Sequence, residues 1–363
     1  MTKLNRMAEQ GQAIWLDFIR RSFSISGELG ILVEQGLRGV TSNPSIFEKA
    51  IAGSEDYAAD LGELVEAGKS DNEIYEALTL NDIQLAADIL RPVYDATDGQ
   101  DGYVSLEVNP GLAHETDGTL REAERLFNVL DRPNAMIKIP ATPEGIPAIE
   151  GAVSKGINVN VTLIFSVKHY QAAALAYIAG LENYRDNGGN IARVASVASF
   201  FVSRVDTAVD KLLDGINGGD KLVGKASIAN AKIGYERYKR IFSSERWQKL
   251  ANLGARVQRP LWASTSTKNP AYPDTLYVDE LIGPDTVNTI PPETLEAFLH
   301  HGKIAPTLES ELDQAHSHLA RLEQLGIDLD AVTETLQADG VTAFARSFAG
   351  LMSSIAAKRS ALQ

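Results

Sequence analysis

Lys138 is the residue whose surroundings point most directly to chemistry. It lies between Ile137 and Ile139 in the apolar segment MIKIPA, where its side chain is expected to be buried. Burial disfavours the ammonium form of a lysine and leaves a nucleophilic amine. Such an amine forms a Schiff base with a carbonyl substrate. The alternative interpretation is a structural lysine whose ammonium group reaches a carboxylate at the end of a strand.

Two carboxylates, Asp17 and Glu107, end other apolar segments and are candidates for proton transfer. Chemistry around a Schiff base needs an acceptor for the proton of a substrate hydroxyl. It also needs a group that handles protons while water leaves and returns. Each carboxylate taken alone could equally be one partner of a structural ion pair. Acid/base catalysis therefore requires a fold that brings both of them to Lys138.

Further polar residues at the ends of apolar segments could hold a substrate. Asn43, in the sequence TSNPS, offers an amide, although Asn followed by Pro is also an ordinary helix start. Arg204 and Lys268 carry groups that bind phosphate, and serine hydroxyls add hydrogen bonds. Ser227 and Asn230 receive no role. The candidates for contact with substrate or with a catalytic water are Asn43, Asn160, Thr162, Ser199, Arg204, Ser264, Ser266 and Lys268.

The composition limits the class of protein. The chain has 363 residues, of which 44% are hydrophobic and 23% are charged, the usual balance of a globular protein with a sizeable core. Its 34 basic and 48 acidic residues give a net charge of −14. We therefore expect neither nucleic acid nor an anionic membrane as a partner. An anionic substrate would need a local cluster of basic residues.

The sequence contains no cysteine, which excludes disulfides, thiolate catalysis and cysteine metal sites. The N-terminal segment has no apolar core of the kind found in signal peptides. No apolar run approaches the ~18 residues that suggest a membrane-spanning helix. We therefore expect a cytoplasmic protein.

Short apolar segments alternate with helical periodicity along most of the chain, which predicts parallel strands joined by helices. Segments such as VNVTLIF are apolar on both faces, as in strands covered on both sides. Eight such units predict a (β/α)8 barrel, with a doubly wound sheet as the alternative. The expected strands are Ala13–Phe18, Gly39–Ser42, Tyr103–Val108, Ala135–Pro140, Asn158–Phe165, Val194–Phe200, Lys225–Ala231 and Pro260–Ser264.

The rest of the sequence predicts helices and loops around these strands. Two helices are expected between the second and third strands, the second of them beginning at a capping box at Ser70. A proline-rich loop is expected after Ser264, and three helices over about 293–363 are expected to pack on the barrel. Residues 1–363 are expected to form one domain. Active sites of such barrels lie at the carboxyl ends of the strands, where the candidate residues stand.

Six segments together resemble the transaldolase family, the Schiff-base enzymes of the pentose phosphate pathway. They are WLDFIRR, GVTSNPSIFEKAI, VSLEVNP, MIKIPAT, NVNVTLIFS and SFFVSRVD, and they occur in the family's order over most of the predicted barrel. WASTSTKNP and VNTIPPETLEAFLHHG are similar to the longer bacterial branch of the family. Other members carry an arginine near the second serine of WASTSTKNP, where this chain offers Ser266 and Lys268.

The resemblance implies a (β/α)8 barrel that transfers a dihydroxyacetone unit from sedoheptulose 7-phosphate to glyceraldehyde 3-phosphate. The products would be erythrose 4-phosphate and fructose 6-phosphate. It implies that Lys138 forms the imine, that Asp17, Glu107 and Thr162 take part in catalysis, and that the remaining polar candidates bind substrate. No metal or organic cofactor is implied. We expect a monomer or a homodimer.

Two other functions stay open at this point. One is a related aldolase that cleaves or makes fructose 6-phosphate and releases free dihydroxyacetone. The smaller aldolases of that kind differ at the glutamate position, so the presence of both Asp17 and Glu107 favours the transferase. The other is a non-catalytic barrel that binds sugar phosphates. A binding site has no need for a buried amine that is unfavourable to desolvate, and Lys138 therefore argues against it.

Overall fold

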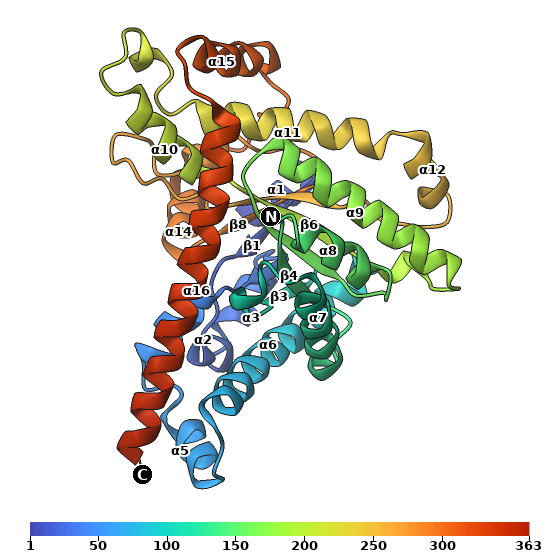
Figure 1. Cartoon of the computed structure of the whole chain (residues 1–363), viewed down its shortest axis with the longest axis vertical. Coiled ribbons are helices and arrows are strands. Elements are labelled where there is room, and N and C mark those ends of the chain that lie inside the picture. The colour runs from blue at the N-terminus through green and yellow to red at the C-terminus, as the bar shows by residue number, and fades with distance from the viewer. Residues whose placement is uncertain (363) are drawn as a thin grey trace.

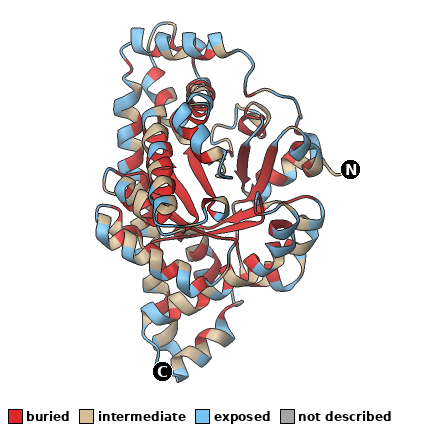
Figure 2. Cartoon of the chain, turned by 90° about the vertical axis from the view of Figure 1, so that its right-hand side faces the viewer, coloured by how far each residue is buried: buried red, intermediate tan, exposed pale blue. Residues whose placement is uncertain are grey.

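The computed structural model describes residues 1–362 and contains a closed barrel of eight parallel strands. The strands follow one another around the barrel in chain order, and the last pairs with the first. Figure 2 shows them as a buried centre surrounded by helices whose outer faces are exposed. The predicted (β/α)8 fold is therefore confirmed. The strands are β1 (Gln12–Leu16), β2 (Gly39–Thr41), β3 (Tyr103–Glu107), β4 (Ala135–Pro140), β5 (Val159–Ile164), β6 (Ser196–Phe201), β7 (Arg259–Ala263) and β8 (Thr286–Ile290).

Every strand is followed in the chain by at least one helix, and helices surround the barrel (Figure 1). The helices up to β5 are α1 (Lys3–Glu9), α2 (Arg21–Ile25), α3 (Glu28–Glu34), α4 (Pro44–Phe47), the π-helical turn η1 (Glu48–Ala52), α5 (Ala58–Glu66), α6 (Asp71–Ala96), η2 (Pro110–Leu112), α7 (Thr116–Leu130) and α8 (Gly145–Val153). Those after β5 are α9 (Val167–Asp186), η3 (Ile191–Arg193), α10 (Ser203–Leu213), η4 (Gly219–Lys221), α11 (Ala226–Phe242), α12 (Glu245–Ala251), α13 (Leu276–Asp279), α14 (Pro292–His301), α15 (Leu312–Gln324) and α16 (Leu329–Leu362).

The two helices expected between the second and third strands are α5 and α6. The side chain of Ser70 accepts a hydrogen bond from the backbone N–H of Glu73, and the Glu73 carboxylate accepts one from the backbone N–H of Ser70. Each residue thus satisfies an N–H that the helix itself leaves without a partner. The predicted capping box is confirmed.

The strand register brings three chemistry-bearing residues to one level of the barrel. Glu107 of β3 is paired with Lys138 of β4, and Lys138 is paired with Asn160 of β5. The pairing of β5 with β6 then shifts, and Leu163 adopts a left-handed backbone with φ of 57°. Irregularities of this kind occur next to active sites, where they redirect a side chain.

The prediction for the last two strands is wrong. Lys225–Ala231 lies almost wholly in helix α11, and its alanines are buried because that helix packs against its neighbours. Pro260–Ser264, expected as the eighth strand, corresponds to β7. The true β8 lies inside the segment expected to be a loop. Only Val287 and Ile290 of its five residues are apolar, which is too few to indicate a strand.

Three helices, α14 to α16, follow β8, and α16 runs along most of the length of the molecule (Figure 1). Gln337 of α16 donates hydrogen bonds of 3.0 Å to the carbonyl oxygens of Ala141 and Leu163, just beyond β4 and near the end of β5. Ser347 of α16 contacts Ser45 near the start of α4. The helix therefore crosses the edge of the barrel where these strands end. No helix within residues 1–362 is long and apolar enough to cross a membrane.

Candidate active site

A cavity of about 610 Å³ opens at the carboxyl ends of the strands. It brings together residues from β1, β2, β4, β6, β7 and β8 and from α16. Eight of the predicted site residues line it: Asp17, Asn43, Lys138, Ser199, Arg204, Ser264, Ser266 and Lys268. The other three, Glu107, Asn160 and Thr162, are buried on the two strands that flank Lys138.

Lys138 is buried, with 4% of its surface exposed, and both flanking isoleucines are fully buried. Its Nζ donates a hydrogen bond of 3.1 Å to the carbonyl oxygen of Ser42, just beyond β2. The nearest carboxylate oxygen, Glu107 Oε2, is 3.8 Å from Nζ. One backbone bond and one longer ionic contact hold the amine in place while it still faces the cavity. This geometry suits a nucleophile that must reach a carbonyl carbon.

Glu107 and Thr162 each present a buried oxygen that has no hydrogen-bond partner in the protein. These atoms are Glu107 Oε2 and Thr162 Oγ1. Buried polar atoms are almost always hydrogen-bonded, so each of these oxygens suits a hydrogen bond with a water molecule. Burial raises the pKa of Glu107 to about 7, against the lowering effect of the Lys138 charge. A carboxyl group with this pKa can give and take a proton near neutral pH.

Asp17 lies just beyond β1 on the opposite side of the cavity from β5. Its Oδ1 accepts a hydrogen bond of 2.7 Å from Thr41, whose hydroxyl is 2.6 Å from that of Thr289 on β8. Burial raises the pKa of Asp17, and the charge of Lys138 and the bond from Thr41 oppose that rise. The threonines fix the orientation of a carboxylate that can accept a proton from substrate.

The two asparagines have their side-chain amides oriented by the protein. Asn43 Oδ1 caps helix α4 by accepting from the backbone N–H of Ile46 at 3.0 Å. Asn160 Oδ1 accepts from Ser199 Oγ at 2.7 Å, and its Nδ2 donates to Ser105 Oγ at 3.0 Å. Each carbonyl oxygen thus has a protein donor, and the second N–H of the Asn160 amide and the amide N–H groups of Asn43 remain for substrate hydroxyls. The hydroxyl of Ser199 therefore orients the Asn160 amide.

The basic residues lie on the connections after β6 and β7. The guanidinium carbon of Arg204 is 5.2 Å from the centre of the Phe201 ring, and burial lowers the pKa of this guanidinium. Lys268 donates a hydrogen bond of 2.7 Å to the hydroxyl of Ser266. Ser264 adopts φ of 55°, a left-handed backbone that is uncommon for serine and recurs at functional sites.

The cavity is locally basic although the chain is acidic. Its lining contains five cationic side chains, Arg20, Lys49, Lys138, Arg204 and Lys268, and two acidic ones, Asp17 and Glu293. A phosphorylated sugar would meet an attractive local potential there despite the net charge of −14. Within residues 1–362, no group of three or more His, Cys, Asp or Glu side chains is arranged to hold a metal ion.

Sequence reasoning missed several residues of the cavity. Phe344 of α16 is buried with its ring centre 6.0 Å from Lys138 Nζ, yet it lies more than 200 positions away in the chain and carries no local signal. Thr289 was missed because β8 was taken for a loop. Lys49 follows the TSNPS motif and could have been noticed as a base within one helical turn of it.

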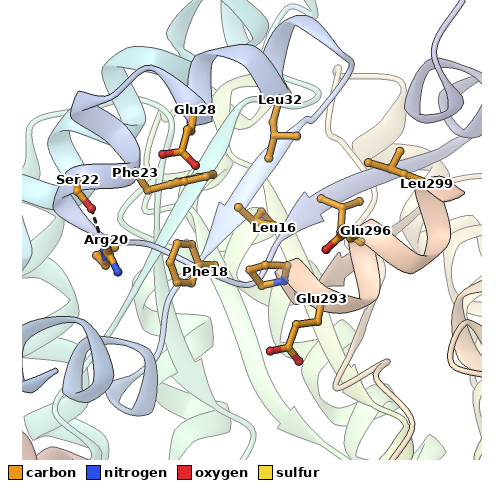
Figure 3. A pocket seen from close by; sticks show the side chains of 12 residues that line it. Leu16, Phe18, Arg20, Ser22, Phe23, Glu28, Leu32, Glu293, Glu296 and Leu299 are labelled. Atoms are coloured by element: carbon orange, nitrogen blue, oxygen red, sulfur yellow. Dashed lines mark hydrogen bonds between the residues drawn. The ribbon is translucent and has the colours of Figure 1, made fainter. Parts of the chain in front are cut away.

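A second cavity of about 560 Å³ shares the wall formed by Phe18, Arg20, Pro292 and Glu293 with the first. Its lining is largely apolar, as Figure 3 shows for Leu16, Phe18, Phe23, Leu32 and Leu299. Arg20, on its rim, donates a hydrogen bond of 2.8 Å to Ser22. This cavity is lined by no lysine. Of the two cavities, only the first is lined by both a lysine buried on a barrel strand, Lys138, and the candidate proton acceptor Asp17.

Comparison with known proteins agrees with this geometry. The sequence profile described as Transaldolase/Fructose-6-phosphate aldolase matches residues 14–355. A transaldolase of Acidothermus cellulolyticus is 50% identical over 356 residues, covering 97% of this chain and 95% of that protein. A transaldolase of Thermobifida fusca is 49% identical over 357 residues, covering 97% of both chains. Transaldolase 2 of Nostoc punctiforme is 48% identical over 366 residues, covering 97% of this chain and 96% of that protein. The resemblance seen in the sequence is confirmed, and the chain belongs to the transaldolase/fructose-6-phosphate aldolase family.

Proposed function

We propose that this chain is a transaldolase, which transfers a dihydroxyacetone unit from sedoheptulose 7-phosphate to glyceraldehyde 3-phosphate. The products are erythrose 4-phosphate and fructose 6-phosphate. The observation that carries the proposal is the buried amine of Lys138, with Glu107 Oε2 at 3.8 Å and Asp17 lining the same cavity. A nucleophile with two proton-handling groups is what Schiff-base transfer needs.

The first half of the reaction forms the imine. Lys138 Nζ attacks the C2 carbonyl carbon of the ketose, and a proton moves from nitrogen to the new hydroxyl group. Protonated Glu107 then donates a proton to that hydroxyl, the C–O bond breaks, and water leaves as the C=N bond forms. Thr162 holds the departing water beside Glu107, a role supported by the two buried oxygens without protein partners.

The second half breaks and remakes a carbon–carbon bond. The Asp17 carboxylate takes the proton from the C4 hydroxyl, the C3–C4 bond breaks, and the electron pair passes into the imine to give an enamine. The aldehyde product leaves while Asn43 and Asn160 hold the hydroxyls of the three-carbon unit. The acceptor aldehyde then binds, the enamine carbon attacks it, and Asp17 returns the proton to the new alkoxide. Water hydrolyses the product imine.

The phosphate of each substrate lies at the other end of the cavity in this proposal. Arg204 makes a forked contact, Lys268 adds charge, and Ser264 and Ser266 add hydrogen bonds. The position of all four residues on the cavity wall supports the assignment. The aromatic contact of Arg204 also supports it, because the ring limits the movement of the guanidinium.

The test is reduction of the imine in the presence of substrate. Borohydride with fructose 6-phosphate should attach a three-carbon or six-carbon adduct to the peptide containing Lys138, as read by mass spectrometry. An adduct on Lys155 or Lys225 would overturn the assignment. A product assay separates the two activities of the family. With an acceptor present, a transaldolase forms the new ketose phosphate and releases little free dihydroxyacetone, whereas an aldolase releases it without an acceptor.

A further inference from the structure

A buried carboxylate, Asp206, lies behind the proposed phosphate end of the cavity. It is on the first turn of α10, 1% exposed, and does not line the cavity. Its Oδ1 accepts a hydrogen bond of 2.8 Å from the backbone N–H of Ser227, and its Oδ2 accepts one of 2.8 Å from the hydroxyl of Tyr277. Burial raises the pKa of Asp206 to about 6, and these bonds oppose the rise. The carboxylate is therefore stabilised by donors from two other elements.

Ser227, which received no role from the sequence, connects Asp206 to the turn that carries Arg204. Its Oγ accepts a hydrogen bond of 2.7 Å from the backbone N–H of Asp206 and donates one of 2.7 Å to the carbonyl oxygen of Val202. Val202 is the residue before helix α10, and Arg204 is the second residue of that helix. Ser227 thus holds the start of α10 from the side of α11.

Hydrogen bonds also connect the first turn of α10, on its other side, to the residue that follows β7. The backbone N–H of Ser203 donates a hydrogen bond of 3.0 Å to the carbonyl oxygen of Ser264, and the two serine hydroxyls are 3.0 Å apart. The backbone of Arg204 is therefore held between Ser264 on one side and the Ser227–Asp206 pair on the other. Such double support limits where a guanidinium can reach.

Tyr277 links this hydrogen-bond network to the connection that carries the second basic residue, Lys268. It lies on α13, in the long connection from β7 to β8 that begins with Ser264, Ser266 and Lys268. A second bond reinforces the link, because Tyr272 in the same connection donates to Asp210 of α10 at 2.5 Å. One face of α10 thus anchors the connection that carries Lys268.

We propose that Asp206, through Ser227 and Tyr277, is a positioning residue that sets the separation of Arg204 and Lys268 for the phosphate group of the sugar. The inference rests on the phosphate assignment made under Proposed function. A preformed pair of cations binds phosphate better than two side chains that must be ordered on binding, because less conformational entropy is lost.

The test compares two tyrosines whose hydroxyls each donate to a buried aspartate. Tyr277→Phe removes the hydroxyl that donates to Asp206, and Tyr57→Phe removes one that donates to buried Asp82 at 2.7 Å, in a cluster between α5 and α6. For Tyr277→Phe we expect the KM for fructose 6-phosphate and the inhibition constant of inorganic phosphate to rise by about three- to tenfold, the effect of one hydrogen bond. The kcat/KM for unphosphorylated fructose should stay within twofold. Tyr57→Phe should lower the melting temperature similarly and change neither constant.

Two further variants distinguish an error in the positioning role from an error in the phosphate assignment. Ser227→Ala should reproduce the phosphate-selective effect of Tyr277→Phe, and it provides the measurement if Tyr277→Phe does not fold. Arg204→Ala is the reference for loss of phosphate contact. If Arg204→Ala is phosphate-selective while both network variants change only the melting temperature, the positioning role is wrong and the phosphate site stands. If Arg204→Ala lowers the kcat/KM for fructose 6-phosphate and for unphosphorylated fructose equally, the phosphate assignment is wrong. The positioning role, which rests on that assignment, is then wrong as well.

Discussion

The two ends of the proposed catalytic cavity are built in different ways. At the imine end, Glu107, Lys138 and Asn160 are consecutive neighbours across β3, β4 and β5, and each is at most 7% exposed. At the phosphate end, Arg204 begins a helix and Lys268 lies on a long connection, where it is exposed. Strand pairing fixes the first set, whereas hydrogen bonds between helices and loops fix the second.

This difference indicates which functional groups must be positioned accurately and which elements of the fold position them. Covalent chemistry requires reacting atoms to meet within a few tenths of an ångström, and a barrel strand is the most rigid support available. Phosphate recognition tolerates a wider range of positions, because charge acts over a longer distance than a bond. We therefore expect mutations at the imine end to change the chemical steps, and mutations at the phosphate end to change affinity.

The largest effect is expected from Lys138→Ala. Removal of the amine removes the covalent intermediate, so transfer and borohydride trapping should both fall below detection. Mass spectrometry after reduction with fructose 6-phosphate measures the trapping. A normal folded signal in circular dichroism serves as the control, because replacing a buried lysine by alanine leaves a small cavity inside the barrel. Residual trapping on another lysine would contradict the assignment.

Asp17→Ala should separate imine formation from bond cleavage. Borohydride should still trap the ketose on Lys138, because that step uses Glu107. Release of the aldehyde should slow by about 10²- to 10⁴-fold, the usual contribution of one general base. A coupled assay for erythrose 4-phosphate, or for glyceraldehyde 3-phosphate from fructose 6-phosphate, measures the release. Aldehyde release at the normal rate would remove Asp17 from this role.

Arg204→Ala should act on affinity at the other end of the cavity. Loss of a charge-assisted contact destabilises the bound phosphate by about 1.5–3 kcal/mol, which corresponds to roughly tenfold to a hundredfold in KM for phosphorylated ketoses. The kcat/KM for unphosphorylated fructose should change little, so steady-state kinetics with both donors is the measurement. Equal losses with both donors would mean that Arg204 supports the fold instead.

Glu107→Gln tests the electrostatics of the imine end through stability. Because the pKa of Glu107 is raised to about 7, there is a pH range between the ordinary pKa of glutamate and about 7. In this range Glu107 keeps a proton in the folded protein that it has released in the unfolded chain. Stability is then greatest below the ordinary pKa of glutamate and falls as pH rises through about 7. Between pH 5 and pH 8 the free energy of unfolding of the parent should fall by on the order of 1–3 kcal/mol more than that of the variant, because glutamine has no carboxyl group to titrate. Urea unfolding at both pH values gives the difference, and parallel losses in the two proteins would argue against a raised pKa.

Lys268→Ala should give the smallest effect. The side chain is exposed, so screening by salt reduces its contribution to phosphate binding. We expect a rise of about two- to fivefold in KM for fructose 6-phosphate, shrinking as salt is added. Kinetics at low and high ionic strength measure it. A loss as large as that of Arg204→Ala would place the main phosphate contact on the β7–β8 connection.

Much of the fold was readable because local patterns and tertiary structure agree. The first six strands are buried on both faces, as strands covered by helices must be, and all six predictions overlap the observed elements. Lys138 stood out for the same reason, since a single charge within such a strand has few explanations. Ser70 marked a helix start because its capping bonds involve residues only three apart.

The errors came where buried polar residues hide a strand or a helix supplies an apolar run. TVNTI of β8 carries Thr286 and Asn288 into buried positions, where Gln12 Nε2 donates to Thr286 Oγ1 and Thr265 Oγ1 donates to Asn288 Oδ1. KASIANA is apolar because it is the buried start of α11. A run of seven residues does not distinguish a buried strand from a buried helix, since both lack exposed positions.

The sequence by itself predicted the barrel class and the family and singled out Lys138, Asp17 and Glu107 as candidates, because these depend on residue types within short segments. Only the tertiary structure decided that Phe344 faces Lys138, that Thr289 supports Asp17, and that Ser227 and Tyr277 meet on Asp206. Barrel closure and the packing of helices bring such residues together across dozens to hundreds of positions. A contact of that kind leaves no periodic trace in a single sequence, because each partner alone is an ordinary buried residue.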